Sequence, residues 1–117
     1  MINTEEWRKK IVENLKTVYD PEIPINIVDL GLIYELKIGE EGDVNIKVGA
    51  TSPFCPVVDY LLLAVEEVIK EAVKPRSLKV DLDLQTTWTP LMMTEEGRKM
   101  FKERFGYDIL EVYKERQ

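Results

Sequence analysis

The sequence predicts an α+β domain of two layers, in which two or three helices cover one face of a small, mostly antiparallel sheet of three strands. Short segments in which apolar and polar residues alternate predict the strands, because such alternation gives a sheet one buried and one solvated face. Longer segments with apolar residues at helical spacing predict the helices. The segments follow the order α-β-β-α-β-α, and a fourth strand at the C-terminus is an alternative for the last residues.

The first helix is predicted to begin at Asn3, whose side chain can cap it, with Glu6 three positions later. Its buried face would consist of apolar residues at helical spacing: Trp7, Ile11, Leu15 and Val18. The helix must end near Tyr19, because each proline of the following segment, Pro21 and Pro24, pushes the residue before it out of the α region. Residues 20–31 are therefore expected to form a tight, ordered connection.

Two strands joined by a turn at residues 39–43 are predicted next. Their inward side chains would be Leu32, Tyr34, Leu36 and Ile38 in residues 32–38, and Val44, Ile46, Val48 and Ala50 in residues 44–50. A third strand, residues 78–84, would point four side chains inward: Leu78, Val80, Leu82 and Leu84. The pattern leaves two positions open for this strand, parallel beside the second strand or antiparallel beside the first.

Between the second and third strands, residues 57–73 carry a broad apolar stripe that predicts a central helix ending near Pro75. A last helix is expected from Thr94, a suitable N-cap, to Gly106, a suitable stop. Acidic residues in its first turn and basic residues in its last turn complement the helix dipole. Residues 107–117 alternate poorly and fit either an edge strand or a helical end.

Length and composition predict one domain that spans residues 1–117, and 44% hydrophobic residues suffice for one core. The net charge of −6 predicts repulsion from phosphate backbones and anionic surfaces, so neither nucleic acid nor a membrane is an expected partner. The N-terminus is polar, and the longest unbroken apolar run, residues 61–65, is too short to span a bilayer. We therefore expect a cytoplasmic protein.

Cys55 is the only cysteine, and the chain contains no histidine. These facts exclude a Cys/His dyad, a Ser/His/Asp triad and a histidine-ligated zinc site built from this chain alone. Pro56 suits the first turn of the central helix, which places Cys55 near the N-cap, where the helix dipole stabilises a thiolate. The alternative is a small buried hydrophobe, as free cysteines often are. The flanking prolines and the hydroxyls of Thr51 and Ser52 favour the reactive thiol.

Three carboxylates are candidate pocket residues near one end of the sheet. Asp20 and Glu22 lie on the proline-containing turn, and Asp29 stands two residues before Gly31. Such a group could bind a metal, orient water or move protons. The alternative is structural, because aspartate before proline is a normal turn former and Asp29 could cap a turn that closes at Gly31.

Residues 87–93, which follow the third strand, concentrate large apolar side chains in a segment without periodicity. The segment could fold back over the core, which is the favoured interpretation, or stay partly exposed as a docking patch. Trp88, Pro90 and Met92 are the candidate partner-binding residues of such a patch.

Four motifs resemble those of the SufT/PaaD-like, MIP-eighteen-type family of iron-sulfur cluster assembly proteins. They are residues 20–24 (DPEIP), 26–34 (NIVDLGLIY), 51–56 (TSPFCP) and 88–90 (WTP). The resemblance covers nearly the whole chain, although Phe54, Met92 and Met93 depart from the common form. It implies a small α/β domain that helps iron-sulfur proteins mature, alone or fused to a cluster-carrier ATPase. It also implies that Cys55 is the functional thiol, with Asp20, Glu22, Thr51 and Ser52 around it. We expect Cys55 to be the metal contact, and Ile23 and Asp29 to complete the pocket.

A stable cluster normally needs four thiolate ligands, or thiolates partly replaced by histidine, whereas this chain supplies one thiol. An iron-sulfur cluster or iron is therefore expected to bind transiently, and the monomer should hold none firmly. The expected function is non-enzymatic cluster assembly or transfer, with iron-sulfur client proteins and a cluster-carrier ATPase as partners and a homodimer as one possible state. The alternative is an adaptor that docks such an ATPase or a ring-oxidising oxygenase complex. A thiol enzyme is least favoured, since the usual imidazole partner is absent.

Overall fold

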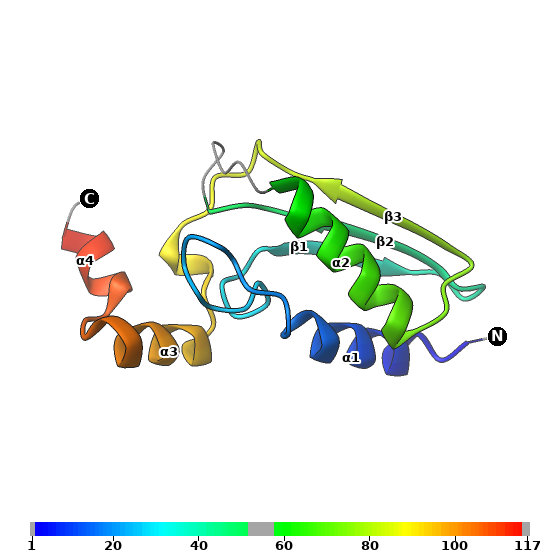
Figure 1. The fold of residues 1–117 in the computed structure, drawn as a ribbon, viewed down its shortest axis with the longest axis horizontal. Coiled ribbons are helices and arrows are strands. Elements are labelled where there is room, and N and C mark those ends of the chain that lie inside the picture. The colour runs from blue at the N-terminus through cyan, green and yellow to red at the C-terminus, as the bar shows by residue number, and fades with distance from the viewer. Residues whose placement is uncertain (1, 52–57, 116–117) are drawn as a thin grey trace.

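The computed structural model describes residues 2–51 and 58–115. The described elements follow the order α1 (Thr4–Leu15), β1 (Ile33–Ile38), β2 (Asp43–Val48), α2 (Val58–Ala72), β3 (Ser77–Leu82), the 3₁₀ turn η1 (Pro90–Met92), α3 (Glu95–Phe105) and α4 (Ile109–Glu115) (Figure 1). The predicted α+β class and order are confirmed. The C-terminal alternative is settled in favour of a helix, because α4 occupies the place of the possible fourth strand.

The sheet has the order β1-β2-β3. β1 and β2 form the predicted antiparallel hairpin, whereas β3 runs parallel to β2, with Asp43 opposite Ser77 and Val48 opposite Leu82. The sheet is therefore mixed, with one antiparallel and one parallel pair, rather than mostly antiparallel. The physical reason is the crossover through α2, which returns the chain to the end of the sheet at which β2 began.

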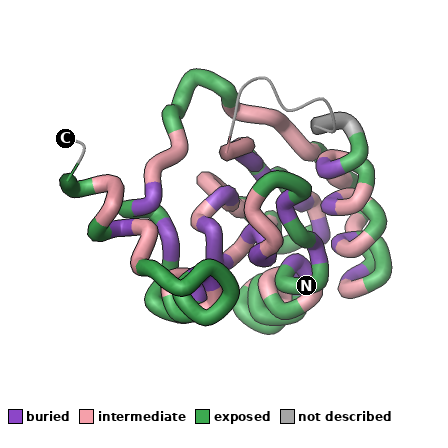
Figure 2. The backbone as a smooth tube through the Cα atoms, turned by 60° about the vertical axis from the view of Figure 1, so that its left-hand side comes forward, coloured by how far each residue is buried: buried purple, intermediate pink, exposed green. Residues whose placement is uncertain are grey.

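The core lies between the sheet and the two helices α1 and α2, which pack against each other (Figure 1). Figure 2 shows the buried segments in the interior, with exposed backbone around them. Both the sheet and the helix layer contribute fully buried side chains: Val44, Ile46 and Val48 from β2, and Leu61, Val65 and Ile69 from α2. The inward row predicted for the third strand fails at Leu84, which is 49% exposed because β3 ends two residues earlier, at Leu82.

A bulge in β1 changes the inward row predicted there. The register with β2 shifts between Ile33 and Glu35, so Tyr34 is the extra residue. Ile33 packs against the core, while Tyr34 lies over Gly49, where a Cβ would collide with the tyrosine ring. The prediction that Tyr34 faces the core with Leu36 and Ile38 is therefore wrong, since an inserted residue moves one side chain to the other face.

The predicted helix ends are present. Asn3 Oδ1 accepts a hydrogen bond from Glu6 N at 3.1 Å at the start of α1. Thr94 Oγ1 accepts one from Gly97 N at 3.0 Å at the start of α3, and Gly106 ends that helix with a φ of 83°. Among the helices that the structure describes, none has both the length and the apolar character needed to cross a membrane.

Candidate functional site

The parallel pairing places the carboxyl ends of β2 and β3 at the same end of the sheet. β2 leads to Thr51, and β3 leads to the turn that Asp83 begins. A small cavity of about 100 Å³ lies between these connections, lined by Ala50, Thr51, Leu84, Thr86, Thr87 and Trp88. Open α/β sheets commonly bind ligands at the carboxyl ends of their strands, so this end of the sheet is the natural place for a site.

The side chain of Asp20 holds the proline-containing turn against this end of the sheet. Only 3% of the residue is exposed, and its Oδ2 accepts hydrogen bonds from Glu22 N at 3.0 Å and Ile23 N at 2.9 Å. Thr51 Oγ1 donates to the same oxygen at 3.3 Å. The carboxylate therefore closes the proline-containing turn and ties it to the residue that precedes the cysteine segment. The structure thus brings together Asp20 and Thr51, which are 31 residues apart in the sequence.

The other residues of this turn are placed differently. The Glu22 residue is exposed to solvent, and Ile23 is half-buried and packs against the core. Ser52 and Cys55 lie outside the described residues. Their predicted places in the pocket therefore stay predictions.

Asp29 is 5% exposed and has partners of its own. Its Oδ2 accepts from Asn26 Nδ2 and its Oδ1 accepts from Thr94 Oγ1, both at 2.7 Å. Its backbone oxygen accepts from Thr94 N at 3.0 Å and lies so close to Gly97 that a Cβ there would collide with it. Both carboxylate oxygens are thus engaged in holding the start of α3 against the 26–31 turn. These bonds give Asp29 a structural role, and its place in the pocket stays a prediction.

This network includes residues that the sequence analysis missed. Asn26 Oδ1 accepts from Asp29 N at 2.9 Å, so Asn26 and Asp29 bond each other through both backbone and side chain. An asparagine three residues before an aspartate is a recognisable turn signal. The partnership with Thr94, 65 residues away, has no local signal.

Residues 88–93 both cover the core and remain partly exposed. Trp88 Nε1 donates to Leu30 O at 2.6 Å, and Pro90 is buried. Leu91 is 60% exposed and Met92 36% exposed, so these two side chains form the exposed part of the segment. Leu91 was not among the predicted partner-binding residues, although it lies between two of them.

Gly31 allows this segment to lie against the 26–31 turn. Its φ is 79°, and a Cβ at this position would collide with the carbonyl group of Met92. Only glycine accepts this conformation without strain and this approach without a clash. Gly31 therefore brings the exposed Leu91 and Met92 close to the turn that contains Asp29.

Two titratable groups near the cavity have shifted pKa values. Hydrogen bonds from the backbone and hydroxyl of Thr86 lower the pKa of Asp83, which begins the turn after β3. Burial, and secondarily the charge of Asp83, raises the pKa of Tyr34. Asp83 is therefore ionised and Tyr34 neutral at physiological pH. Within residues 2–51 and 58–115, no group of three or more His, Cys, Asp or Glu side chains is placed to hold a metal ion.

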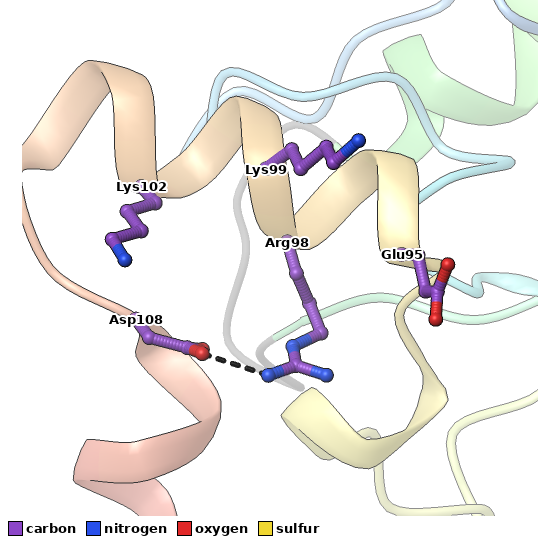
Figure 3. Close-up of a pocket in the computed structure, with 5 residues that line it drawn as sticks. All are labelled: Glu95, Arg98, Lys99, Lys102 and Asp108. Carbon is purple, nitrogen blue, oxygen red and sulfur yellow. Dashed lines mark hydrogen bonds and ion pairs between the residues drawn. The ribbon is translucent and has the colours of Figure 1, made fainter.

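A second cavity, of about 290 Å³, lies between α3 and the start of α4 and is lined by Glu95, Arg98, Lys99, Lys102 and Asp108 (Figure 3). Arg98 Nη2 donates to Asp108 Oδ2 at 2.7 Å across it. This hydrogen bond raises the pKa of Arg98 and lowers that of Asp108. Asp108 Oδ1 also accepts from Leu110 N at 3.0 Å, so the pair fixes α4 against α3.

These features define a small two-layer α+β domain whose candidate site lies at the carboxyl ends of a parallel strand pair. Residues 8–87 match the family model described as iron-sulfur cluster assembly protein. The chain belongs to this family, which confirms the resemblance inferred from the four motifs. The helices α3 and α4 follow the matched residues.

Relatives support this assignment. The chain is 40% identical over 96 residues to an Fe-S protein maturation auxiliary factor of Porphyromonas gingivalis, covering 82% of this chain and 89% of the relative. It is 32% identical over 81 residues to the Fe-S protein maturation auxiliary factor SufT of Staphylococcus aureus, covering 69% of this chain and 92% of the relative.

Solved structures share the fold. A domain of unknown function from Bacillus anthracis matches with a TM-score of 0.75 and 27% identity, covering 82% of this chain and 92% of that one. A conserved hypothetical protein from Thermotoga maritima matches with a TM-score of 0.70 and 31% identity, covering 86% and 94%.

Proposed function

We propose that this protein is a non-enzymatic factor of the cytoplasm that assists the maturation of iron-sulfur proteins through the thiol of Cys55. Membership of the iron-sulfur cluster assembly family supports this proposal. Relatives from Porphyromonas gingivalis, Staphylococcus aureus and Bacillus subtilis are named Fe-S protein maturation auxiliary factors. The partners would be apo-forms of iron-sulfur proteins and an ATPase that carries clusters.

The hydrogen bond from Thr51 Oγ1 to Asp20 Oδ2 is the observation that carries the proposal. Cys55 follows Thr51 by four residues in the sequence, so this bond anchors the start of the segment that contains the thiol. Because Asp20 is 3% exposed and also bonds two backbone N–H groups, the anchor is part of the rigid fold. Thr51, the last described residue before the segment that contains the thiol, is therefore fixed to the core of the fold.

The chemistry of one thiol favours transfer over storage. The Cys55 thiolate would displace one thiolate of a cluster that the donor still holds through its other ligands, and the freed donor sulfur would take up the proton that Cys55 lost. Thiolates of the recipient protein would then displace the remaining donor thiolates one at a time, and the last of them would displace Cys55. Each exchange forms one iron-sulfur bond, breaks another and returns one proton to the displaced sulfur, so no electron is transferred. Because Cys55 supplies only one of the ligands that a cluster needs, it cannot retain the cluster against the recipient.

Anaerobic transfer of a cluster to an apo-protein tests the proposal. The visible circular dichroism of the recipient measures how much cluster it has received. The Cys55→Ser variant should lose the transfer that the wild type supports. Thr51→Val should slow transfer about tenfold if the anchor is worth about 1.5 kcal/mol. Thr86→Val is the matched control, because its hydroxyl bonds Asp83 at 2.8 Å in the same cavity without touching Asp20. Full transfer activity in Cys55→Ser would reject the proposal.

A second candidate function, docking of a partner protein without use of the thiol, is favoured by the exposure of Leu91 and Met92. Trp88 is a poor probe of this function, because its hydrogen bond to Leu30 makes it part of the fold. Leu91→Asp changes a side chain that is 60% exposed. If Leu91→Asp abolishes complementation of a deletion strain while Cys55→Ala complements fully, docking is the function and transfer is not.

A further inference from the structure

β3 has one paired edge and one open edge. β2 pairs along one side, and in the part of the chain that the structure describes no strand pairs along the other. Figure 1 shows β3 along the rim of the molecule. Asp83 N donates to Val48 O, so the odd-numbered residues of this strand turn their backbone groups toward β2. The N–H and C=O groups of Leu78, Val80 and Leu82 therefore face outward.

The helix layer stops short of this open edge. The inward side chains of β2, which are Val44, Ile46 and Val48, are 0%, 1% and 0% exposed. Those of β3, which are Leu78, Val80 and Leu82, are only partly buried. Apolar surface and outward-facing backbone groups thus lie together along β3, and such an edge can accept another strand.

The solvated face of β3 carries charges that fit a second copy of the same strand. Lys79 and Asp81 lie there, with side chains 70% and 46% exposed and their charged atoms 3.9 Å apart. In an antiparallel pair centred on Val80, Lys79 of each copy lies opposite Asp81 of the other. These two residues form non-hydrogen-bonded pairs, in which side chains approach most closely, while the outward backbone groups supply about six hydrogen bonds.

The charges also select the register. A slip of two residues in one direction would set Lys79 against Lys79 of the other copy, and a slip in the other direction would set Asp81 against Asp81. Like charges placed directly opposite each other destabilise a strand pair. The register centred on Val80 is therefore the one that this sequence favours.

We propose that two copies of this chain associate through the open edges of β3, in this antiparallel register, to form one continuous sheet. The edge of β1 is less suited, because the bulge at Tyr34 interrupts it.

The dimer keeps the two candidate sites apart. Its twofold axis passes between the two Val80 residues, so the ends of the two sheets that carry Thr51 point in opposite directions. At about 3.3 Å per residue, they are separated by roughly 30 Å or more. The dimer is argued from β3 alone and does not depend on the proposed function.

Charge reversal tests both the edge and the register. Lys79→Asp alone and Asp81→Lys alone each place like charges opposite each other, so each should raise the dimer Kd at least about tenfold. An equimolar mixture of the two variants should associate as tightly as the wild type, because every aspartate then faces a lysine. Lys37→Asp, a reversal on β1, is the matched control and should leave the Kd unchanged.

Sedimentation equilibrium up to about 1 mM chain covers the affinity expected of a small interface, and circular dichroism melts verify that each variant folds. Amide exchange adds an independent measurement: protection of the Val80 N–H should rise with concentration, while that of Asp81, which faces β2, should not. A wild type that stays monomeric overturns the proposal. So does a dimer that the single variants leave unchanged, or a mixture that fails to associate.

Discussion

Replacing Asp29 by alanine should destabilise the fold strongly. The size of this loss shows whether the Asp29 carboxylate has a structural role or belongs to the pocket. The change removes the acceptors of Asn26 Nδ2 and Thr94 Oγ1, both bonded at 2.7 Å. Asn26 is 4% exposed, so its amide would be left in a buried place without an acceptor. The junction between the 26–31 turn and α3 would then depend mainly on the backbone bond from Thr94 N to Asp29 O, at 3.0 Å.

The expected loss follows from these contacts. A hydrogen bond to a charged group contributes about 1.5 kcal/mol or more, and an unsatisfied buried donor costs a similar amount. The free energy of unfolding should therefore fall by about 3 kcal/mol. For a chain of 117 residues, each kcal/mol shifts the Tm by about 4 °C, so the Tm should fall by about 12 °C.

Urea denaturation followed by circular dichroism measures this loss, and Asp83→Ala is the matched control. The Asp83 carboxylate accepts three hydrogen bonds, one more than that of Asp29, from Gln85 N, Thr86 N and Thr86 Oγ1, but in an exposed turn. Water can replace those bonds, so the control should lose much less stability than Asp29→Ala. If Asp29→Ala is as mild as the control while cluster transfer collapses, Asp29 belongs to the site and the structural argument is refuted.

Two further predictions concern backbone conformation and pH. Gly31→Ala should cost about 3 kcal/mol or more, because the new Cβ would collide with the Met92 carbonyl at a φ of 79°. Gly106→Ala, with a φ of 83° and no atom within 4 Å of the new Cβ, should cost only about 1 kcal/mol. Urea denaturation measures both free energies of unfolding, and equal losses in the two variants would contradict this prediction. Arg98 lowers the pKa of Asp108 below its ordinary value of 3.8, so the stability from this pair is present above that value and disappears as the pH falls below it. The Tm difference between wild type and Asp108→Asn should therefore be present at about pH 7 and shrink as the pH falls below 3.8, and a difference independent of pH would exclude the ion pair as its cause.

Sequence patterns predicted those parts of the fold that depend on neighbouring residues. Asn3, Thr94 and Gly106 were identified as helix ends because capping requires particular side chains at fixed offsets. The helix α4 could have been predicted by the same reasoning, because Asp108 accepts from Leu110 N at its start. Poor alternation of the apolar residues after Gly106 concealed it.

Features that depend on contacts across the chain were beyond local patterns. The bulge at Tyr34 depends on space above Gly49, which directly follows β2. The parallel position of β3 depends on the path of the α2 crossover rather than on the residues of β3. At the candidate site, the family resemblance grouped Asp20 with Thr51, whereas the pairing of Asp29 with Thr94 had neither a motif nor a local signal.

The helices α3 and α4 extend the molecule to one side, which gives extents of 48 × 26 × 21 Å and a radius of gyration of 14.9 Å (Figure 1). A compact chain of this length has a radius of about 13.4 Å. An elongated particle experiences more hydrodynamic friction than a sphere of equal mass, so a single chain elutes early from a size-exclusion column. Elution volume would therefore overstate the mass of a lone chain, and subunit number must come from light scattering or from a sedimentation gradient at equilibrium.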